Sequence, residues 1–565
     1  SDTKLIDLLA KRTYDESGSY TVNPWKIQLY DIPNNASQYR IDIQEGLGYV
    51  RGYEVNTIVS TSLTVDKPRD TITKHNTSVF NESGCYALGL MSNNVLDAKN
   101  LPASKTNVNV MSGTNGTGSV LGTATIFNYS REGSQFRIYL INTSNVVNSF
   151  NGARSLVSQN DSTSYINLYI NEDGYAELNG SEVPFIYSTG QENVNTIVDN
   201  SIQYQMVRKY TATSSNNNTL TILESNPSIN MPTTEGLIAV YSGSKFLNVD
   251  ELIMTPNNTD TVSYAIISGD AIQNNTQYTV YVKTNSDRGS QRSKTLTTVT
   301  ETLTVLPNVS VKTLGNADIL DIVSIVQSSN TNDKTPDDLK AYLNFNNGQS
   351  DYYYNNGSLS GFNSDVLNTF KNSVNASTQY QVTYRYFIHS GSGPFTVDSY
   401  VTSQNQSAYG SKPIYDAIPT YTADNGTTYR LTDCFDFRTK SSDATNTFEN
   451  VPIPRTELIA DVTKYLPRID ALYVASNGEF GILPGISSEN PVEPIGNEYI
   501  MILYYLENKP YVRSVSDVGL TYVDNRRYTM KDIGKLNTRL TNVEDMVSLN
   551  QLEQSAVNMQ ITDTS

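Results

Sequence analysis

The stretch YQVTYRYFIH, residues 380–389, decides the fold class of this chain. It contains two interleaved sets of side chains, in which Tyr380, Val382, Tyr384, Tyr386 and Ile388 alternate with Gln381, Thr383, Arg385 and His389. A period of two is typical of a β-strand, because successive side chains point to opposite faces of a sheet. The first set is the more apolar one, so it predicts a strand with that face buried.

The same pattern continues outward from this strand. Tyr278, Val280 and Val282 alternate in the same way before a turn-rich segment. Asn-Gly and Asp-Gly pairs separate short apolar segments at residues 115–116, 173–174, 179–180 and 425–426. Glycine tolerates the positive φ that tight hairpin turns require. We therefore predict a mainly β chain of several chained antiparallel β-sandwich-like modules.

Short helices interrupt the β pattern at three places. Residues 2–11 are amphipathic because three leucines share one face. Residues 335–338, Thr-Pro-Asp-Asp, combine a capping residue, a first-turn proline and first-turn acids, which together signal a helix start. A third short helix is predicted over residues 365–371.

The sequence changes character after residue 525. Residues 529–559, TMKDIGKLNTRLTNVEDMVSLNQLEQSAVNM, contain a single glycine and no proline. Thr529 with Asp532 makes a suitable helix start, since the hydroxyl can accept a hydrogen bond from a free backbone N–H. Apolar residues then follow at alternating steps of three and four: Ile533, Leu536, Leu540, Val543 and Val547. This spacing predicts the a/d seam of a C-terminal α-helical coiled-coil segment, and hence self-association.

The predicted seam changes register near its end. Its continuation puts Asn550 at a core position, whereas Leu549 and Leu552 belong to a shifted apolar stripe and are further candidate oligomerisation residues. Arg539 and Glu544 fall at a g and the following e position, where opposite charges favour a parallel homotrimer or homodimer. The alternative is one amphipathic helix that lies on the sheet of its own domain.

At 565 residues the chain is too long for one hydrophobic core. Shifts in pattern divide it into an N-terminal helix plus β module (1–75), a β domain (76–210), an Ig-like β-sandwich insert (211–310), a β domain with short helices (311–455), a β module (456–525) and the helical coiled-coil segment (526–565). The formal net charge of −17 and the lack of a basic block argue against nucleic-acid binding. No apolar run is long enough to span a bilayer, so membrane insertion is not expected.

Few residues suggest catalysis. Only two histidines occur: we place His75 in a loop, and we interpret His389 as a sheet-edge side chain at the end of its strand. Metal-ligand pairs of the HExxH or CxxC type and glycine-rich phosphate loops are missing from the sequence. We therefore predict no catalytic residues, no cofactor and no metal, and we expect that the chain is not an enzyme.

Residues 433–438, DCFDFR, are the most suggestive polar run. They could form an Asp–Arg polar site, but we favour a strand in which Asp436 and Arg438 share one face and pair. For Cys434 and Cys85 we expect two buried free thiols rather than a disulfide. Residues 171–174, Asn-Glu-Asp-Gly, fit a hairpin turn better than a calcium loop.

Several longer segments resemble an uncharacterised family of tail structural proteins from large contractile-tailed phages, cyanophages prominently. They include LAKRTYDESGSYTVNPWKIQL (9–29), EGLGYVRGYEV (45–55), DKPRDT (66–71), LGNADILDIVSI (314–325), NNGQSDYYYNNGSL (346–359), GPFTVDSY (393–400), YDAIPTY (415–421), LTDCFDFRTK (431–440), VPIPRTELIADVTKYLPRIDALYV (451–474), GEFGILPGISSENPVEP (478–494) and DNRRYTMKDIGKLNTRL (524–540). These segments follow the family order along nearly the whole chain, which is more specific than any one motif. Ser350 departs from the pattern, because a basic residue is expected there.

The resemblance implies a virion structural protein, made in the cytoplasm of a host bacterium and assembled into the phage tail. It favours a baseplate component, in the wedge or at the periphery, that oligomerises and connects other baseplate and tail-fibre proteins. One rival function is a receptor-binding tail fibre or adhesin, whose tyrosines at 352–354 would stack on host-surface glycans. The other is a tail-associated polysaccharide depolymerase that uses paired carboxylates.

Overall fold

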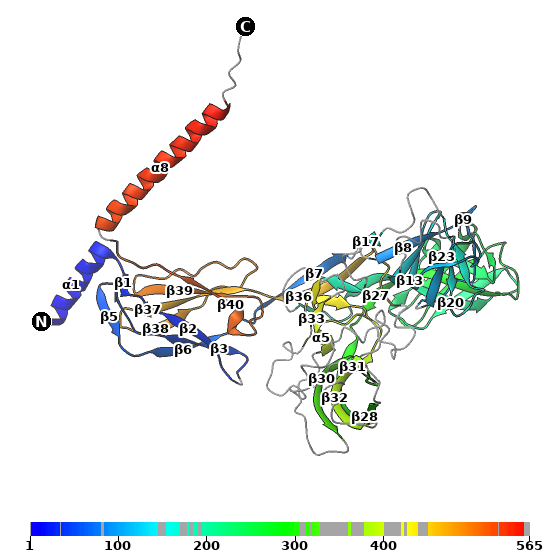
Figure 1. Ribbon diagram of the computed structural model, residues 1–565, viewed down its shortest axis with the longest axis horizontal. Helices are drawn as coiled ribbons and strands as arrows, with labels where there is room; N and C mark the ends of the chain where they lie inside the picture. Colours follow the sequence, from blue (N-terminus) through cyan, green and yellow to red (C-terminus); the bar gives the residue numbers. More distant parts are fainter. Residues whose placement is uncertain are drawn as a thin grey trace, which may run out of the picture. The chain divides into compact units, whose positions relative to one another are not determined.

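The structure is a computed structural model, and it confirms a mainly β chain with several antiparallel sheets. It describes residues 2–33, 35–80, 84–104, 106–144, 154–169, 178–179, 185–189, 195–305, 312–316, 318–327, 360–362, 378–400, 418, 420–422, 427–438, 450–528 and 530–558. The chain forms two compact units. Unit 1 contains residues 1–70 and 466–565, and unit 2 contains residues 71–465 (Figure 1).

Unit 1 is built from strands of both chain ends. Its sheets have the strand orders β1(Tyr20–Asn23)-β4(Gly46–Val50)-β5(Tyr53–Thr57), β2(Ile27–Asp31)-β3(Gln38–Ile43)-β6(Thr61–Asp66) and β38(Phe480–Leu483)-β37(Arg468–Ala475)-β39(Ile500–Asn508)-β40(Val518–Tyr522). One hydrophobic core joins them, with Tyr39 and Ile41 from the first segment packed together with Leu472 and Leu506 from the second. We predicted 1–75 and 456–525 as separate modules, whereas residues 1–70 and 466–525 of these segments lie in one unit and share one core.

Trp25 is the largest side chain of this core. Its ring lies so close to β4 that a Cβ on Gly46 would stand 2.5 Å from the ring, and one on Gly48 would stand 2.8 Å from it. The indole N–H donates to Thr57 Oγ1 at 2.7 Å, so the one polar atom of this buried ring is satisfied. Gly46 and Gly48 thus make room for the tryptophan.

Unit 1 also carries the two longest helices among the residues that the structure describes, α1 (Asp2–Ser17) and α8 (Met530–Asn558). The predicted helix over residues 2–11 is confirmed and continues to Ser17. α8 is a single uninterrupted helix (Figure 1). A coiled coil is not shown.

Unit 2 contains two large sheets. The first has the order β11(Ala98–Lys99)-β16(Tyr165–Asn167)-β15(Ser155–Ser158)-β12(Thr106–Met111)-β13(Val120–Glu132)-β14(Gln135–Ser144)-β8(Gly84–Gly89)-β17(Leu178–Asn179). The second has the order β19(Asn195–Ile197)-β36(Glu457–Tyr465)-β20(Ile202–Thr213)-β27(Gln277–Gly289)-β23(Leu237–Ser242)-β24(Lys245–Phe246), with β7(Thr71–Phe80) on β36 and β22(Ile229–Asn230) on β27. The predicted turn at 115–116 lies between β12 and β13, with positive φ at Asn115 and Gly116.

A third sheet, β21(Thr219–Glu224)-β26(Ser263–Ser268)-β25(Ile253–Asn258), shares a core with β23 and β27 of the second large sheet. Leu220 and Ile267 come from one layer, whereas Val240 and Val280 come from the other. Apolar side chains of two sheets therefore meet across one interior within residues 219–282. Tyr278, Val280 and Val282 are buried as the alternation at 278–282 predicts, but Tyr281 on the opposite face is buried as well, so burial does not alternate throughout this strand.

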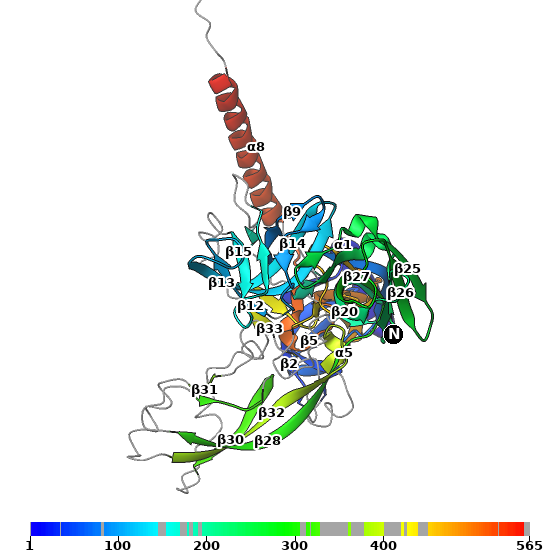
Figure 2. The same ribbon diagram turned by 90° about the vertical axis from the view of Figure 1, so that its right-hand side faces the viewer.

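Residues 380–389 lie in β32 (Thr378–Ser390), the middle strand of the sheet β28(Ser293–Val305)-β32-β30(Ile319–Gln327) (Figure 2). The strand is confirmed, but its burial pattern is only half as predicted. Val382 and Tyr384 are buried, whereas Ile388 is 46% exposed and Phe387 is buried instead. Burial passes from the face of the strand that carries Val382 and Tyr384 to the opposite face, which carries Phe387. Phe387 is covered by the segment that includes α5 (Val397–Tyr400), where it meets the Tyr400 ring.

The remaining small elements are β9(Met91–Ser92), β10(Val95–Leu96), β18(Ile186–Ser188), β29(Lys312–Thr313), β31(Ser360–Phe362), β33(Thr420–Thr422), β34(Thr428–Arg430) and β35(Cys434–Asp436). Within the described residues the 3₁₀ turns are η1(Thr234–Gly236), η2(Val249–Glu251) and η5(Val515–Asp517). The helices predicted at 335–338 and 365–371 lie outside the described residues. So do the turns at 171–174 and 425–426, and the tyrosines at 352–354.

Candidate functional site

The sequence-predicted site is the apolar face of α8, and all of it is exposed. The exposed fractions are 48% for Ile533, 47% for Leu536, 57% for Leu540, 51% for Val543, 49% for Val547, 59% for Leu549 and 68% for Leu552. The alternative, in which this helix lies on the sheet of its own domain, requires that the seam be covered. The structure contradicts that alternative over residues 530–555.

The helix itself follows from local sequence. Between Met530 and Asn558 the chain has no proline, and Asp532 stands in the first turn, where a carboxylate is favoured by the helix dipole. The hydroxyl groups of Thr538 and Thr541 donate hydrogen bonds to the backbone oxygens four residues earlier, each at 3.0 Å. Such bonds satisfy the hydroxyls without help from another element. In proteins a helix usually gains most of its stability from packing of its apolar face. In α8 that face is not covered by the described residues of its own chain.

The base of α8 is fixed to unit 1. Thr21 N donates to Asn525 O at 2.8 Å, and Asn525 Nδ2 donates to Ile502 O at 2.6 Å. The Arg527 guanidinium lies 5.5 Å from the centre of the Tyr20 ring. The DNRRY landmark therefore joins the helix to β1 and β39, so that the seam begins at a defined place on the unit.

α1 is a second exposed apolar helix in the same unit. Leu5, Ile6, Leu8 and Leu9 are each more than half exposed, while Ala10 is buried. Ala10 touches the backbone of Gly52, where a Cβ would stand 1.8 Å from the Ala10 carbonyl oxygen. The helix thus contacts unit 1 by its alanine and leaves its larger apolar side chains uncovered.

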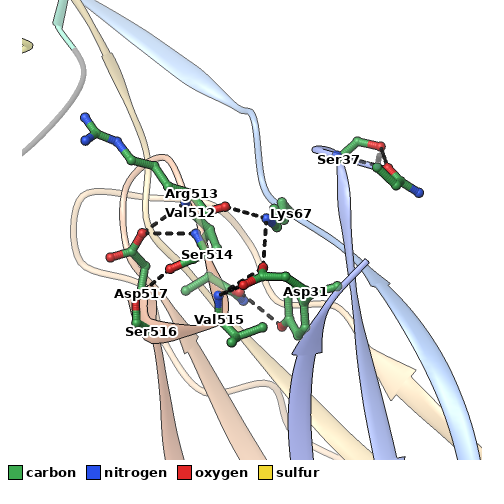
Figure 3. Close-up of polar contacts among 12 residues, drawn as sticks. Asp31, Ser37, Lys67, Val512, Arg513, Ser514, Val515, Ser516 and Asp517 are labelled. Atoms are coloured by element: carbon green, nitrogen blue, oxygen red, sulfur yellow. Dashed lines mark hydrogen bonds and ion pairs between the residues drawn. The ribbon is translucent and has the colours of Figure 1, made fainter. Parts of the chain in front are cut away.

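The DKPRD landmark forms a polar clasp in unit 1, which we define as Asp31, Lys67, Arg69 and the loop 511–517. Figure 3 shows Lys67 between Asp31 and Arg513. Lys67 Nζ donates to Arg513 O at 2.7 Å and lies 3.6 Å from Asp31 Oδ1. Asp31 in turn accepts from Val515 N at 3.2 Å. The lysine is only 6% exposed, so its charge rests on these partners.

Arg69 extends the same clasp. Its Nη2 donates to Val512 O at 3.1 Å, and its guanidinium lies 4.1 Å from the centre of the Tyr511 ring. Asp517 accepts from Arg513 N at 3.0 Å and closes the loop on itself. The clasp joins chain segments more than 440 residues apart, as the separation of 446 between Lys67 and Arg513 shows. We interpret the clasp as structural, because Asp31, Lys67 and Arg69 each bind groups within the same fold.

The two histidines differ from their predicted settings. His75 lies within strand β7 rather than in a loop, and its Nδ1 is 2.9 Å from Asp461 Oδ2. Asp461 also accepts from Asn76 N at 2.8 Å, at a β-bulge where Asn76 has a φ of 51°. His389 is not at a sheet edge, since β32 is the middle strand, and its Nε2 is 2.7 Å from the buried Asp318 Oδ2.

In the run 433–438 the predicted pairing of Asp436 with Arg438 is confirmed, but the predicted strand that carries both residues is not, because the strand ends at Asp436. Arg438 Nη2 donates to Asp436 Oδ2 at 2.8 Å, and Arg438 Nε donates to Asp436 Oδ1 at 2.9 Å. Both residues are 2% exposed, so this bidentate ion pair is buried and does not lie on the surface of the sheet. Only Cys434 through Asp436 form a strand, β35, and Arg438 follows it.

Cys434 is a free, buried thiol, in agreement with the prediction for this residue. Burial, with the nearby Asp433, holds the pKa of this thiol well above its ordinary value, so the group is an unreactive thiol. The part of the chain that the structure describes contains no cluster of three or more His, Cys, Asp or Glu side chains suited to a metal ion. Within the same residues, no helix is both long and apolar enough to cross a membrane.

These features define a class of protein: a mainly β chain whose two chain ends close one unit, from which two apolar helices are exposed. Residues 2–130 and 372–563 match the family described as a domain of unknown function, DUF4815. The matched residues make up more than half of the chain, so this protein belongs to that family. No significant match to a curated protein or to a solved structure was found.

Proposed function

We propose that this protein is a virion structural protein of a contractile phage tail, built from chained sandwich-like β modules, in which copies associate through α8. The observation that carries the proposal is the uncovered seam from Ile533 to Val547. The segments that resemble phage tail proteins support the place of action, a baseplate wedge or its periphery. Family membership by itself is neutral on this point, because the family has no assigned function.

Burial of the seam supplies the driving force. Fully burying a Leu, Ile or Val side chain contributes about 1.5–3 kcal/mol. The seam side chains are already about half covered by their own helix, so burial of each one on association contributes less than this free energy. These contributions add over the five seam positions and over all copies in the bundle. A mixed Ile, Leu and Val seam is compatible with two or three strands. We propose a homotrimer or a homodimer with parallel helices, in which Arg539 of one copy faces Glu544 of the next.

The clasp and the anchored helix base suit this role. A tail component transmits force between neighbours, and unit 1 joins the two ends of its own chain by one core and by the clasp around Lys67. The segment just before α8 is bonded to β1 and close to β39, so the start of the helix is kept near unit 1 in each copy. The proposed partners are other copies of this chain, and then other baseplate and tail-fibre proteins.

Sedimentation velocity of the full chain tests self-association. The wild type is expected to sediment as a trimer or dimer, and the double variant Leu536→Asp/Leu540→Asp as a monomer, because two charges would be buried in every seam. Thr538→Asp is the matched control, since position 538 faces away from the seam and tolerates a charge. A monomeric wild type, or a double variant that sediments like the wild type, contradicts the proposal.

Detection of the chain in purified phage particles tests the place of action. A low-resolution map of the particle is expected to show its density around the tail axis, near the baseplate. Particles whose protein content lacks this chain would contradict the tail assignment and leave the self-association result untouched.

A further inference from the structure

A lysine, an aspartate and a histidine meet in the interior of unit 2. Lys294 is the second residue of β28, and His389 is its register partner on β32. Asp318 directly precedes β30, on the other side of β32, where its carbonyl accepts from Phe387 N at 3.0 Å. Lys294 Nζ lies 2.7 Å from Asp318 Oδ2, and His389 Nε2 lies 2.7 Å from the same oxygen. The lysine therefore reaches across the middle strand.

This cluster is shut off from water. The exposed fractions of the three side chains are 0% for Lys294, 4% for Asp318 and 1% for His389. Aromatic rings form the walls. Lys294 Nζ lies 4.5 Å from the centre of the Phe395 ring and 4.8 Å from that of Tyr400. In such surroundings two opposite charges are costly to keep, even when they are paired.

Proton positions in the resting cluster follow from its charges. Burial by itself would raise the pKa of Asp318, but the Lys294 charge and the His389 hydrogen bond outweigh it and hold that pKa well below its ordinary range. Asp318 also adopts a φ of +59°, which a side chain other than glycine rarely takes. The fold thus holds an amine nitrogen against a carboxyl group, in a dry pocket, beside an imidazole.

We propose that Lys294 and Asp318 form an intramolecular isopeptide bond between Nζ and Cγ. This inference does not depend on the tail assignment, since it rests on the geometry of unit 2 alone. The bond would explain why a lysine is buried at this position. A neutral amide, which can still form hydrogen bonds, would replace an ion pair that is costly to keep in an apolar pocket.

The reaction is a condensation that releases one water molecule. Lys294 passes one proton across the short contact to Asp318 Oδ2, and the neutral amine attacks Cγ. In the tetrahedral intermediate the attacking nitrogen carries an extra proton, and it passes this proton to the Oδ2 hydroxyl, which leaves as water when the C–O bond breaks. The His389 Nε2–H donates a hydrogen bond to Oδ2 and holds this oxygen in place while the proton is transferred. The two protons lost by the ammonium group are those of the water, so no oxidant or other reactant is required.

The bond would tie the two outer strands of the sheet together. β28 and β30 both pair with β32 and not with each other. A link from Lys294 to Asp318 crosses over β32, so that neither outer strand can separate alone. Because hydrogen-bonded strands can be peeled from an edge, a covalent link between the two edges resists that opening.

Intact-mass spectrometry of the full chain under denaturing conditions tests the bond. The wild type is expected to be lighter than its sequence mass by one water molecule. Lys294→Met and Asp318→Ala are each expected to have the full mass of their sequences. Lys209→Met, which removes an exposed lysine on β20, is the matched control and is expected to keep the mass deficit. A wild type of full mass overturns the proposal and leaves a buried ion pair.

Peptide mapping shows where the water was lost and does not require that any variant folds. Trypsin is expected to leave the bond after Lys294 uncut and to yield a branched peptide in which residues 293–312 are joined to residues 313–334. A deficit confined to residues 313–334 would instead indicate a cyclic imide at Asp318 and would overturn the proposal. In His389→Phe the bond is expected to form more slowly, seen as a mixture of two masses whose lighter form grows with time.

Discussion

The two histidine–aspartate pairs of this chain make the same contact in opposite environments. His75 and Asp461 lie 2.9 Å apart with side chains 74% and 26% exposed. His389 and Asp318 lie 2.7 Å apart with side chains 1% and 4% exposed. Each pair joins two neighbouring strands, and in each pair the carboxyl pKa is lowered. The distances are nearly equal, so geometry alone does not distinguish them.

Burial is what separates the two pairs. Water and salt screen the charges of an exposed pair, which typically adds little to stability. In the interior the same contact is stronger, and a group left without its partner is far more costly. The exposed pair closes a bulge between β7 and β36, whereas the buried pair lies at the centre of a polar cluster. We therefore expect mutations to have unequal effects at the two sites.

Asp318→Ala is expected to give the largest effect. It removes the proposed link to Lys294 and leaves the lysine charge buried without a partner, and such an unpaired buried charge typically costs about 3–5 kcal/mol. Hydrogen exchange of the amides in β32 measures the free energy of local opening, which should fall by this amount. The double variant Lys294→Met/Asp318→Ala should recover part of the loss, since it also removes the buried charge. Equal exchange in the wild type and in Asp318→Ala would show that the buried pair contributes nothing.

His389→Phe is expected to have an intermediate effect. The change keeps an aromatic ring against Phe395, whose centre lies 4.6 Å from that of the imidazole, but it removes the donor to Asp318. Loss of one partner of a buried polar group costs about 1–3 kcal/mol. The same exchange measurement on β32 checks this value. His75→Phe is the matched control on the exposed pair, and it should change the opening of β7 by less.

The sequence could not reveal either pair. His389 and Asp318 are 71 residues apart, and His75 and Asp461 are 386 residues apart. Strand alternation is a local signal, so it predicts that residues 380–389 form a strand, but it is silent on the neighbours of that strand. Ile388 shows the limit. The alternation predicted its burial, whereas the cover formed by residues 395–400 buries Phe387 on the other face.

Helix periodicity was a better guide, because a helix depends mainly on residues three and four positions apart. The range and the apolar stripe of α8 could be predicted from that spacing. What covers the stripe could not, because the covering surface belongs to another molecule in our proposal. The clasp around Lys67 was also missed. Its signal in the sequence is the lysine and arginine of DKPRD, but the carbonyl groups that they bind in the loop 511–517 lie more than 440 residues away.

Acid titration of the exposed pair is expected to give the smallest effect and sharpens the comparison. The His75 hydrogen bond and the Asn76 amide lower the pKa of Asp461 in the folded chain. A lowered carboxyl pKa contributes stability that is complete above the unfolded pKa of about 4 and is lost as the pH falls through the folded pKa. The melting temperature of the wild type relative to Asp461→Asn should therefore decrease below about pH 4. The difference should also shrink in high salt, since both groups are exposed to solvent. A difference in melting temperature that is independent of pH and salt would mean that the charge of the exposed pair does not contribute to stability. Charge would then matter only for the buried pair.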